Sequence, residues 1–180
     1  MTQIGNTYAQ ALYDLAKEDH LTERILQQLE TLREAFDGEP DFCRLLSMPN
    51  IGKEERLAVI DSSFRDKVHP YVLNTMKLLT EKGHIRSFAD CCKEFRGLYN
   101  RDHGILQVRA VTATELTDTQ REKLEGKLSA ITGKKIELLC EVEPQVLGGV
   151  RLDWDGKRLD GTVRSRLEGL SASLKKMRLV

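Results

Sequence analysis

The pattern of apolar residues changes at Gly104, and this change limits the possible folds of the chain more than any other feature. Before Gly104, apolar side chains recur every three or four residues, which is the period of a helix with one buried face. After it, residues 105–111 mix isoleucine and valine with polar residues in the manner of a strand. The sequence therefore predicts two domains, an all-helical domain over 1–103 and an α/β domain over 104–180.

The first domain is predicted to be a bundle of six helices joined by short loops. Thr22 is expected to cap the second helix, Pro70 to begin the fifth, and Gly83 to end it. Beyond the first helix, the apolar residues that define the faces are Ile25, Leu29, Leu32, Phe36; Phe42, Leu45, Leu46; Leu57, Ile60, Phe64; Val72, Met76, Leu79; and Phe88, Cys92, Phe95, Tyr99.

The second domain is predicted to be a β-α-β-β-β-α unit, which makes the whole chain an α+β protein. Thr117 and Gln120 have the spacing of a capping box at the start of its first helix. Asp155 and Gly156 predict a two-residue hairpin turn between two strands. Either Asp160 or Thr162 is expected to cap a last helix. The apolar stripe of that helix is Val163, Leu167, Leu170, Leu174 and Met177.

The charge balance excludes two classes of partner. The chain has 28 basic and 28 acidic residues, so it has no net charge with which to bind nucleic acid or a membrane surface generally. Residues 1–6 lack the features of a signal peptide. No stretch has the roughly 20 consecutive apolar residues of a membrane span. We therefore expect an intracellular protein that meets a membrane only through a partner.

No residue pattern indicates catalysis, a cofactor or a metal. Gly133-Lys134 lacks the remaining residues of a phosphate-binding loop, and Gly148-Gly149 lacks the third glycine of a dinucleotide fingerprint. The histidines and cysteines do not have the spacing of a zinc motif. We expect the cysteines to be reduced and mostly buried. These residues are Cys43, Cys91, Cys92, Cys140, His20, His69, His84 and His103.

Three segments together resemble the ATP synthase delta subunit family, which includes the mitochondrial oligomycin-sensitivity-conferring protein. The first is the pair Gly148-Gly149, followed by the turn Asp155-Gly156 and by Asp160-Gly161-Thr162-Val163-Arg164-Ser165-Arg166-Leu167. The second is the run of tyrosines and alanines over residues 8–13. The third is residues 81–84, where His84 replaces the arginine that is frequent in the family. The resemblance covers nearly the whole chain.

This resemblance implies a non-catalytic stator subunit, present in a single copy per complex on the cytoplasmic face of the inner membrane. Its helical domain would bind an amphipathic helix from the N-terminus of an ATP synthase alpha subunit. Its second domain would bind the end of the peripheral stalk formed by the b subunits. The segment implied to face the stalk contains Gly148, Gly149, Asp155, Gly156, Asp160, Gly161, Arg164, Arg166 and Leu167.

In this family the alpha-subunit helix lies between the first and fifth helices. The positions that match are Tyr8, Ala11, Leu12, Leu15, Val72, Met76 and Leu79. Each of them also has a simpler interpretation, in which it belongs to the internal core of the bundle. The core interpretation is favoured for Leu12 and Leu15, and both remain open for Tyr8, Ala11 and Met76.

Two other classes of function are compatible with this composition. An unrelated helical adaptor would capture a partner helix in one groove and would not need residues 155–166. A small enzyme would need a pocket with converging polar groups, of which the sequence gives no sign.

Overall fold

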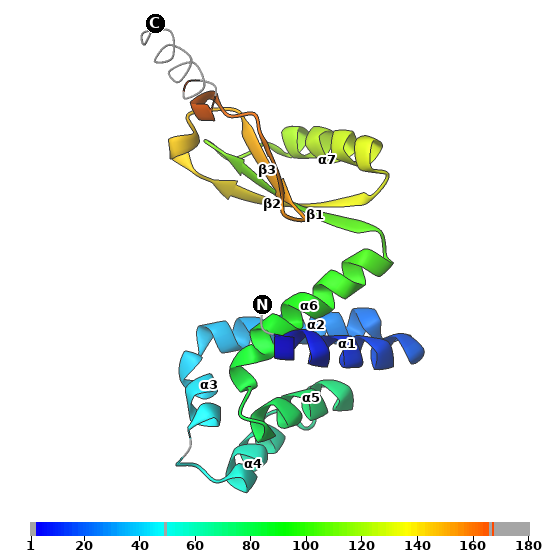
Figure 1. Cartoon of the computed structure of the whole chain (residues 1–180), viewed down its shortest axis with the longest axis vertical. Helices are drawn as coiled ribbons and strands as arrows, with labels where there is room; N and C mark the ends of the chain where they lie inside the picture. The colour runs from blue at the N-terminus through cyan, green and yellow to red at the C-terminus, as the bar shows by residue number, and fades with distance from the viewer. Residues whose placement is uncertain (1–2, 49, 166, 168–180) are drawn as a thin grey trace, which may run out of the picture. The chain divides into compact units, whose positions relative to one another are not determined.

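The computed structural model describes residues 3–48, 50–165 and 167. The chain divides into two compact units, Met1–Asp102 and His103–Val180, so the boundary lies one residue before the expected position. Within the described residues, the first unit is all-helical, and the second contains a four-stranded sheet and one long helix (Figure 1).

The first unit contains six α-helices within the described residues, as the sequence predicts. A short 3-10 helix, η1, which the sequence analysis did not predict, leads into the last of them. The elements are α1 (Gln3–Glu18), α2 (Thr22–Gly38), α3 (Pro40–Ser47), α4 (Lys53–Phe64), α5 (Pro70–Glu81), η1 (Ile85–Ser87) and α6 (Phe88–Asp102).

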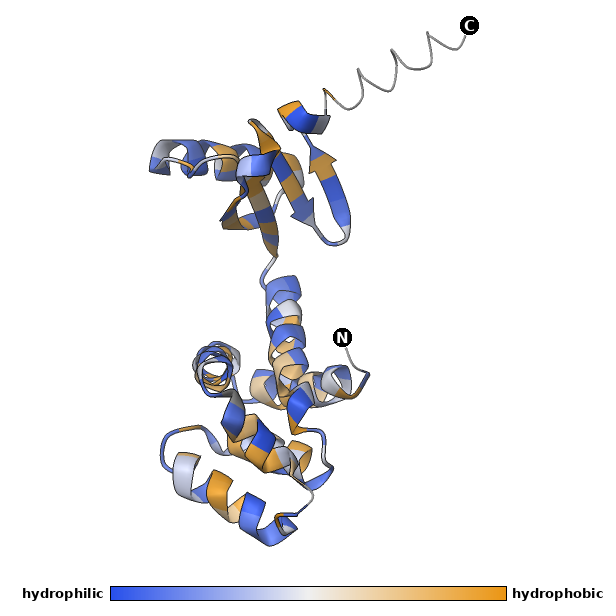
Figure 2. Ribbon diagram, turned by 90° about the vertical axis from the view of Figure 1, so that its left-hand side faces the viewer, coloured by the Kyte–Doolittle hydropathy of each residue, from blue (hydrophilic) through white to orange (hydrophobic). Residues whose placement is uncertain are grey.

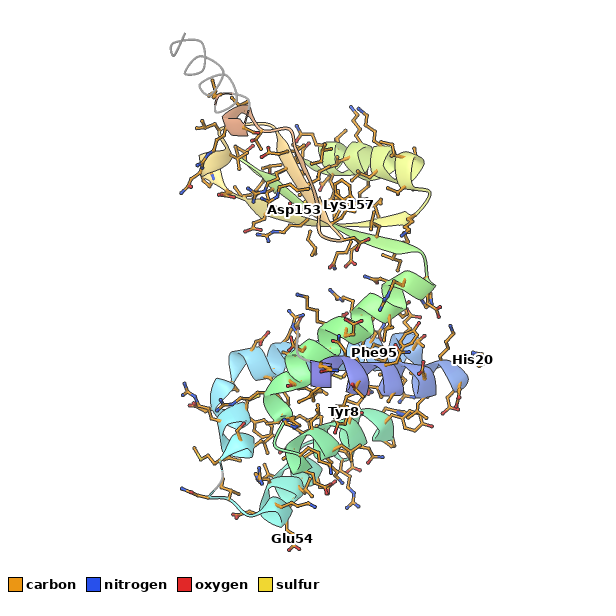
Figure 3. The ribbon with its side chains drawn as sticks, viewed as in Figure 1. Tyr8, His20, Glu54, Phe95, Asp153 and Lys157 are labelled. Atoms are coloured by element: carbon orange, nitrogen blue, oxygen red, sulfur yellow. The ribbon has the colours of Figure 1, made fainter. Side chains whose placement is uncertain are left out.

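Apolar faces of all six helices meet in one core, because each helix repeats its apolar residues at helical spacing. Phe36 lies at a junction of rings, with ring centroids 5.1 to 6.2 Å from those of Phe42, Phe64 and Phe88. Phe95, labelled in Figure 3, meets Tyr13 edge to face at 5.2 Å. These aromatic contacts tie α1, α2, α3, α4 and α6 together.

Small residues allow α1 to lie close to α6. A Cβ atom added at Gly5 would come within 2.8 Å of the Asp90 Cβ on α6, so this position has room only for glycine. At the other end of α1, the Tyr13 hydroxyl donates to Asp102 at 3.0 Å, and Lys17 pairs with the same carboxylate at 2.6 Å. The two helices are thus joined near both ends.

The second unit is built on a mixed sheet with the strand order β2-β1-β3-β4. The strands β1 (Ile105–Thr112) and β2 (Lys135–Val142) are parallel, and the helix α7 (Asp118–Thr132) connects them (Figure 1). The strands β3 (Val150–Trp154) and β4 (Lys157–Asp160) continue the sheet in antiparallel fashion. A 3-10 helix, η2 (Pro144–Val146), precedes β3 and was not predicted.

One face of the sheet packs against α7, and hydropathy alternates along the strands (Figure 2). Leu106, Val108 and Ala110 of β1 form the centre of this small core with Leu152 of β3. Leu124 and Leu128 of α7 cover it, so the even-numbered residues of β1 and β2 face the helix. The predicted capping box at Thr117 and Gln120 is confirmed by both of its hydrogen bonds.

Two sequence-based expectations about local structure were wrong. Thr22 is the first residue of α2 and not its cap, because Leu21 occupies the cap position and makes no side-chain capping bond. The cysteines are less buried than expected, since Cys43 is half-buried and Cys140 is exposed, while Cys91 and Cys92 lie inside the core. Cys140 is exposed because it lies on the edge strand β2.

We predict that Tyr13→Phe changes how stability depends on pH. Burial and the Asp102 carboxylate raise the pKa of Tyr13, so the folded protein keeps this hydroxyl protonated where an unfolded chain would ionise it, above about pH 10. The stabilisation is present below that pH and is lost as the pH rises above it. At pH 7 the variant should lose about 1 kcal/mol in urea unfolding, and the loss should shrink above pH 10. Parallel stability curves for the two proteins from pH 9 to about pH 11 would contradict this.

Candidate functional site

One flank of α1 carries apolar residues that the bundle buries only in part. Ile4, Tyr8, Ala11 and Leu15 are spaced by four, three and four residues, so they form one row along the helix. Ile4 and Tyr8 are half-buried, while Ala11 is exposed and Leu15 is 45% exposed. The opposite flank of α1 faces α6 through Lys17, so this row lies on the side away from α6.

A matching row lies on α5. Lys77 and Glu81 mark the flank of α5 that faces α4, through ion pairs of 2.6 Å with Asp61 and Lys53. On the other flank, the Tyr71 hydroxyl donates to Asp19, just after the end of α1, at 2.6 Å. Because Leu78 lies two helical turns beyond Tyr71, it shares this flank and is 45% exposed.

Together these two rows form what we call the α1–α5 surface. The helices contact each other, and Figure 3 labels Tyr8 on α1. The surface combines aliphatic and aromatic side chains with one alanine, and such a mixture suits an amphipathic helix. It consists of Ile4, Tyr8, Ala11, Leu15, Tyr71 and Leu78.

Several residues expected to line this surface lie in the core instead. Val72, Met76 and Leu79 are fully buried, and Leu12 is 3% exposed, so their side chains support the surface from below. Leu15, favoured as a core residue, is on the surface. The orientation of each helix about its own axis explains this difference, because the face of α5 that carries Val72, Met76 and Leu79 points to the bundle centre. Ile4, Tyr71 and Leu78 were not among the residues predicted for this surface, although their spacing was a usable signal.

In the second unit, the glycine pair Gly148-Gly149 of the family motif meets Gly161 through the backbone. A Cβ atom at Gly149 would lie 2.4 Å from the Gly161 carbonyl oxygen, and Gly149 has a φ of 81°. The Gly161 amide donates to Val150 at 3.0 Å, and the Val163 amide donates to Gly148 at 2.9 Å. These contacts hold the chain after β4 against the loop before β3.

Asp160 and Thr162 have separate roles at this point. The Asp160 carboxylate accepts from the Thr162 amide at 2.9 Å, and this hydrogen bonding lowers the pKa of Asp160. The Thr162 hydroxyl accepts from the Ser165 amide at 3.2 Å, which is the bond of a helix N-cap. Thr162 is therefore the capping residue, and the helix it caps begins among the last described residues.

The predicted turn at Asp155 and Gly156 joins β3 to β4, and both residues have positive φ angles, 43° and 73°. An ion pair joins the two strands beside the turn, because Arg158 of β4 bonds Asp153 of β3 at 2.6 Å and lowers the pKa of that carboxyl. Figure 3 labels Asp153 of β3 and Lys157, the first residue of β4. The turn is thus a structural element of the hairpin.

Exposed apolar side chains flank Gly148-Gly149 and Gly161 in the sequence. We call them the C-terminal apolar patch, and their exposed fractions are 43% to 65%. Val163 is next to Gly148, where an added Cβ would meet a Val163 methyl at 3.4 Å. Arg164 is also exposed, while Arg166 and the rest of the predicted helical stripe from Leu170 onward lie outside the described residues. The patch consists of Leu147, Leu159, Val163 and Leu167.

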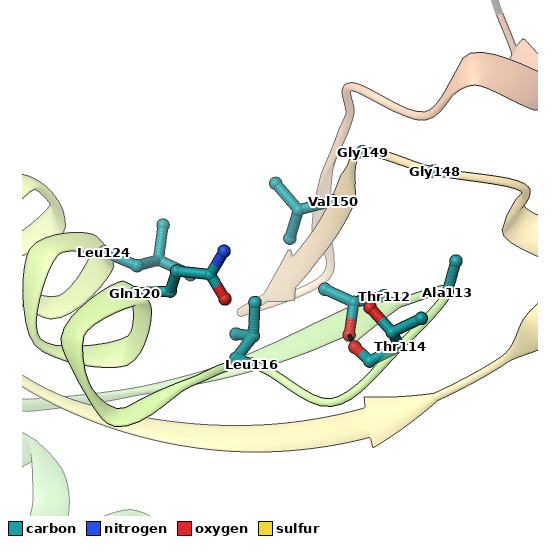
Figure 4. A pocket seen from close by; sticks show the side chains of 9 residues that line it. All are labelled: Thr112, Ala113, Thr114, Leu116, Gln120, Leu124, Gly148, Gly149 and Val150. Carbon is teal, nitrogen blue, oxygen red and sulfur yellow. Dashed lines mark hydrogen bonds between the residues drawn. The ribbon is translucent and has the colours of Figure 1, made fainter.

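A pocket of about 400 Å³ borders the double glycine (Figure 4). None of its lining residues is ionisable. The hydroxyl of Thr112 donates to the Thr114 carbonyl, and the amide oxygen of Gln120 accepts from Thr117. The pocket therefore lacks an acid, a base and an activated nucleophile. Its lining residues are Thr112, Ala113, Thr114, Leu116, Gln120, Leu124, Gly148, Gly149 and Val150.

Two further features of the described part of the chain bear on function. Across residues 3–48, 50–165 and 167, no group of three or more metal-binding side chains comes together. Among the same residues, no helix has both the length and the apolar composition needed to cross a membrane.

We predict that Gly149→Ala destabilises the protein by at least about 2 kcal/mol, because alanine disfavours the positive φ angle and its Cβ would collide with the Gly161 carbonyl. Gly126→Ala is the matched control, since Gly126 lies within α7 with open space around its Cβ position. The control should gain about 0.5 to 1 kcal/mol from helix propensity. Urea unfolding of the two variants measures both effects, and equal stabilities would rule out the close contact.

Comparison with known proteins places this architecture in a family. The model of the family described as ATP synthase delta (OSCP) subunit matches residues 4–174. ATP synthase subunit delta of Gloeothece citriformis is 30% identical over 96% of this chain and 94% of the relative, and that of Alkaliphilus oremlandii is 30% identical over 97% of each. A chain of the Toxoplasma gondii mitochondrial ATP synthase hexamer has the same fold, with a TM-score of 0.76, 21% identity and coverage of 96% and 98%. The chain described here belongs to the ATP synthase delta (OSCP) subunit family.

Proposed function

We propose that this protein is the stator connector of an F-type ATP synthase, joining the catalytic head to the peripheral stalk and resisting the torque of the rotor. The single observation that carries the proposal is the presence of an exposed apolar surface on each of two separate units. A connector needs two such surfaces and no catalytic groups. One copy per complex, held at the cytoplasmic face of the inner membrane by its partners, fits this role.

The α1–α5 surface is the proposed site for the N-terminal helix of an alpha subunit. A helix that lies along two helices presents apolar residues at every third or fourth position. Ala11 leaves room for the backbone of such a guest, and Tyr8 and Leu15 flank it within the same row. The buried Val72, Met76 and Leu79 keep α5 in place beneath the site.

The C-terminal apolar patch is the proposed site for the b subunits of the stalk. Leu147, Leu159, Val163 and Leu167 would lose water-exposed apolar area on binding, which favours association. Two moderate contacts on one connector strengthen each other through effective concentration. The joint between head and stalk therefore does not require an extreme affinity at either surface.

The alternatives are less favourable. An unrelated adaptor does not account for a family match that extends over residues 4–174 and includes both units. An enzyme of the second unit would have to use the pocket beside Gly149, whose lining has no ionisable residue.

We predict that Ala11→Trp leaves the protein folded but weakens binding of a synthetic alpha-subunit N-terminal peptide by at least about 2 kcal/mol, or about 30-fold. The indole would occupy the space reserved for the guest backbone. Ala35→Trp is the matched control, because Ala35 is also exposed but lies on α2. Titration calorimetry should give one-to-one binding with a negative heat-capacity change for wild type and control. Equal affinities of the two variants would remove Ala11 from the site.

We predict that Leu167→Asp weakens binding to the soluble part of the b subunits by about tenfold or more, because a carboxylate replaces an apolar contact of the patch. Ile131→Asp is the control. Ile131 is 81% exposed at the C-terminal end of α7, whereas the patch lies at the opposite end of the sheet. Sedimentation of mixed b and variant proteins measures the difference. If Ile131→Asp has the larger effect, the stalk site lies elsewhere.

A further inference from the structure

The strand β2 is an open edge of the sheet within the described residues of the second unit. It pairs with β1 alone. The Lys135 amide donates to Gly104 at its start, and the Glu143 amide donates to Thr112 beyond its end. Backbone N–H and C=O groups alternate in direction along a strand. Those of the odd-numbered residues therefore bond to β1, and those of the even-numbered residues point away from the sheet. The outward groups belong to Ile136, Leu138, Cys140 and Val142.

Apolar side chains are exposed along the same edge. Cys140 is exposed and Val142 is 45% exposed, both on the face that α7 covers. Ile131, near the end of α7, is 81% exposed. Unpaired backbone groups next to exposed apolar side chains favour the addition of another strand.

We propose that this edge pairs with the β2 edge of a second copy of the chain, in antiparallel orientation, when the protein is free of the ATP synthase. Outward-pointing groups of one strand must meet outward-pointing groups of the other, so even-numbered residues lie opposite even-numbered residues. This pairing of even-numbered residues also places the apolar faces of the two β2 strands on the same side of the joined sheet. The two-fold axis must therefore pass through a single residue of β2.

The charged residues of β2 indicate which residue lies on the two-fold axis. With Leu138 on the axis, Lys135 lies opposite Glu141 of the second copy, and this pair occurs twice. With Leu139 on the axis, Glu137 would lie opposite Glu141, and the repulsion of these two like-charged pairs would offset the attraction of Lys135 to Glu143 beyond the end of β2. The first register also places Ile136 opposite Cys140 on the apolar face.

The exposed end of α7 fits the same register. α7 ends at Thr132 and β2 begins at Lys135, so Ile131 lies close to the first residues of β2. In the proposed pair, the last residues of the other β2 lie beside those first residues. Ile131 of each copy would therefore cover the exposed Cys140 and Val142 of the other. An interface of one strand pair and one helix end is small, so we expect weak association.

Sedimentation equilibrium of the full chain should show a monomer at about 10 µM and twice the monomer mass at about 1 mM. Lys135→Glu should weaken the dimer about tenfold, because both cross-strand pairs become repulsive. Lys134→Glu is the control with the same charge change, since residue 134 lies opposite Val142. A wild-type monomer at every concentration overturns the proposal, and so does a dimer that appears only after removal of residues 168–180, because the end of the chain would then cover the edge.

Disulfide trapping tests the register in a Cys43→Ser, Cys140→Ser background. Residues 137 and 139 of opposite chains form a non-hydrogen-bonded pair in the proposed register, with Cα atoms about 4.5 Å apart, within the reach of a disulfide. A mixture of Glu137→Cys and Leu139→Cys proteins should therefore cross-link under mild oxidation, and neither should cross-link alone. If Leu139→Cys alone cross-links to itself, the axis passes through Leu139 and the proposed register is wrong.

Discussion

The α1–α5 surface depends on the close packing of α1 against α6. Gly5 permits the approach at one end, and Tyr13 and Lys17 bind Asp102 at the other. With α6 on one flank and the core beneath, α1 has one remaining flank to offer a partner. That flank carries Ile4, Tyr8, Ala11 and Leu15. The orientation of a candidate binding surface is thus fixed by residues that belong to its opposite side.

Most of the architecture was predictable from sequence because it depends on local signals. Helical period, proline and glycine positions, the capping box at Thr117 and the turn at Asp155 and Gly156 each act over a few residues. The orientation of α5 about its own axis was not predictable in this way, because apolar spacing shows which residues are buried but not which helices pack beside them. Leu79 is buried with Val72 and Met76 in the core, Leu78 is exposed, and Lys77 and Glu81 form ion pairs with α4. Such ion pairs join residues far apart in the chain.

In the second unit, too, features that depend on neighbouring residues were predictable, and contacts between residues far apart in the chain were not. The short motifs around Gly148 and Asp160 contributed to the family resemblance together with residues 8–13 and 81–84, but their separation in sequence hid the contact between them. The structure shows that contact, because Gly149 and Gly161 lie against each other. Asp155, which the resemblance associated with a partner, lies in the hairpin turn, and the exposed Leu159 lies outside the motif as read.

The glycine contact has a consequence for how this unit can diversify. The start of the last helix is positioned by main-chain bonds from Gly161 and Val163 and by the Thr162 cap, and the exposed leucines take no part in these bonds. The side chains at 159 and 167 can therefore vary without moving the backbone that presents them, whereas position 147 is restricted by its positive φ angle of 65°. A fixed frame with replaceable contacts allows the subunit to follow sequence drift in its partner while the mechanical link persists.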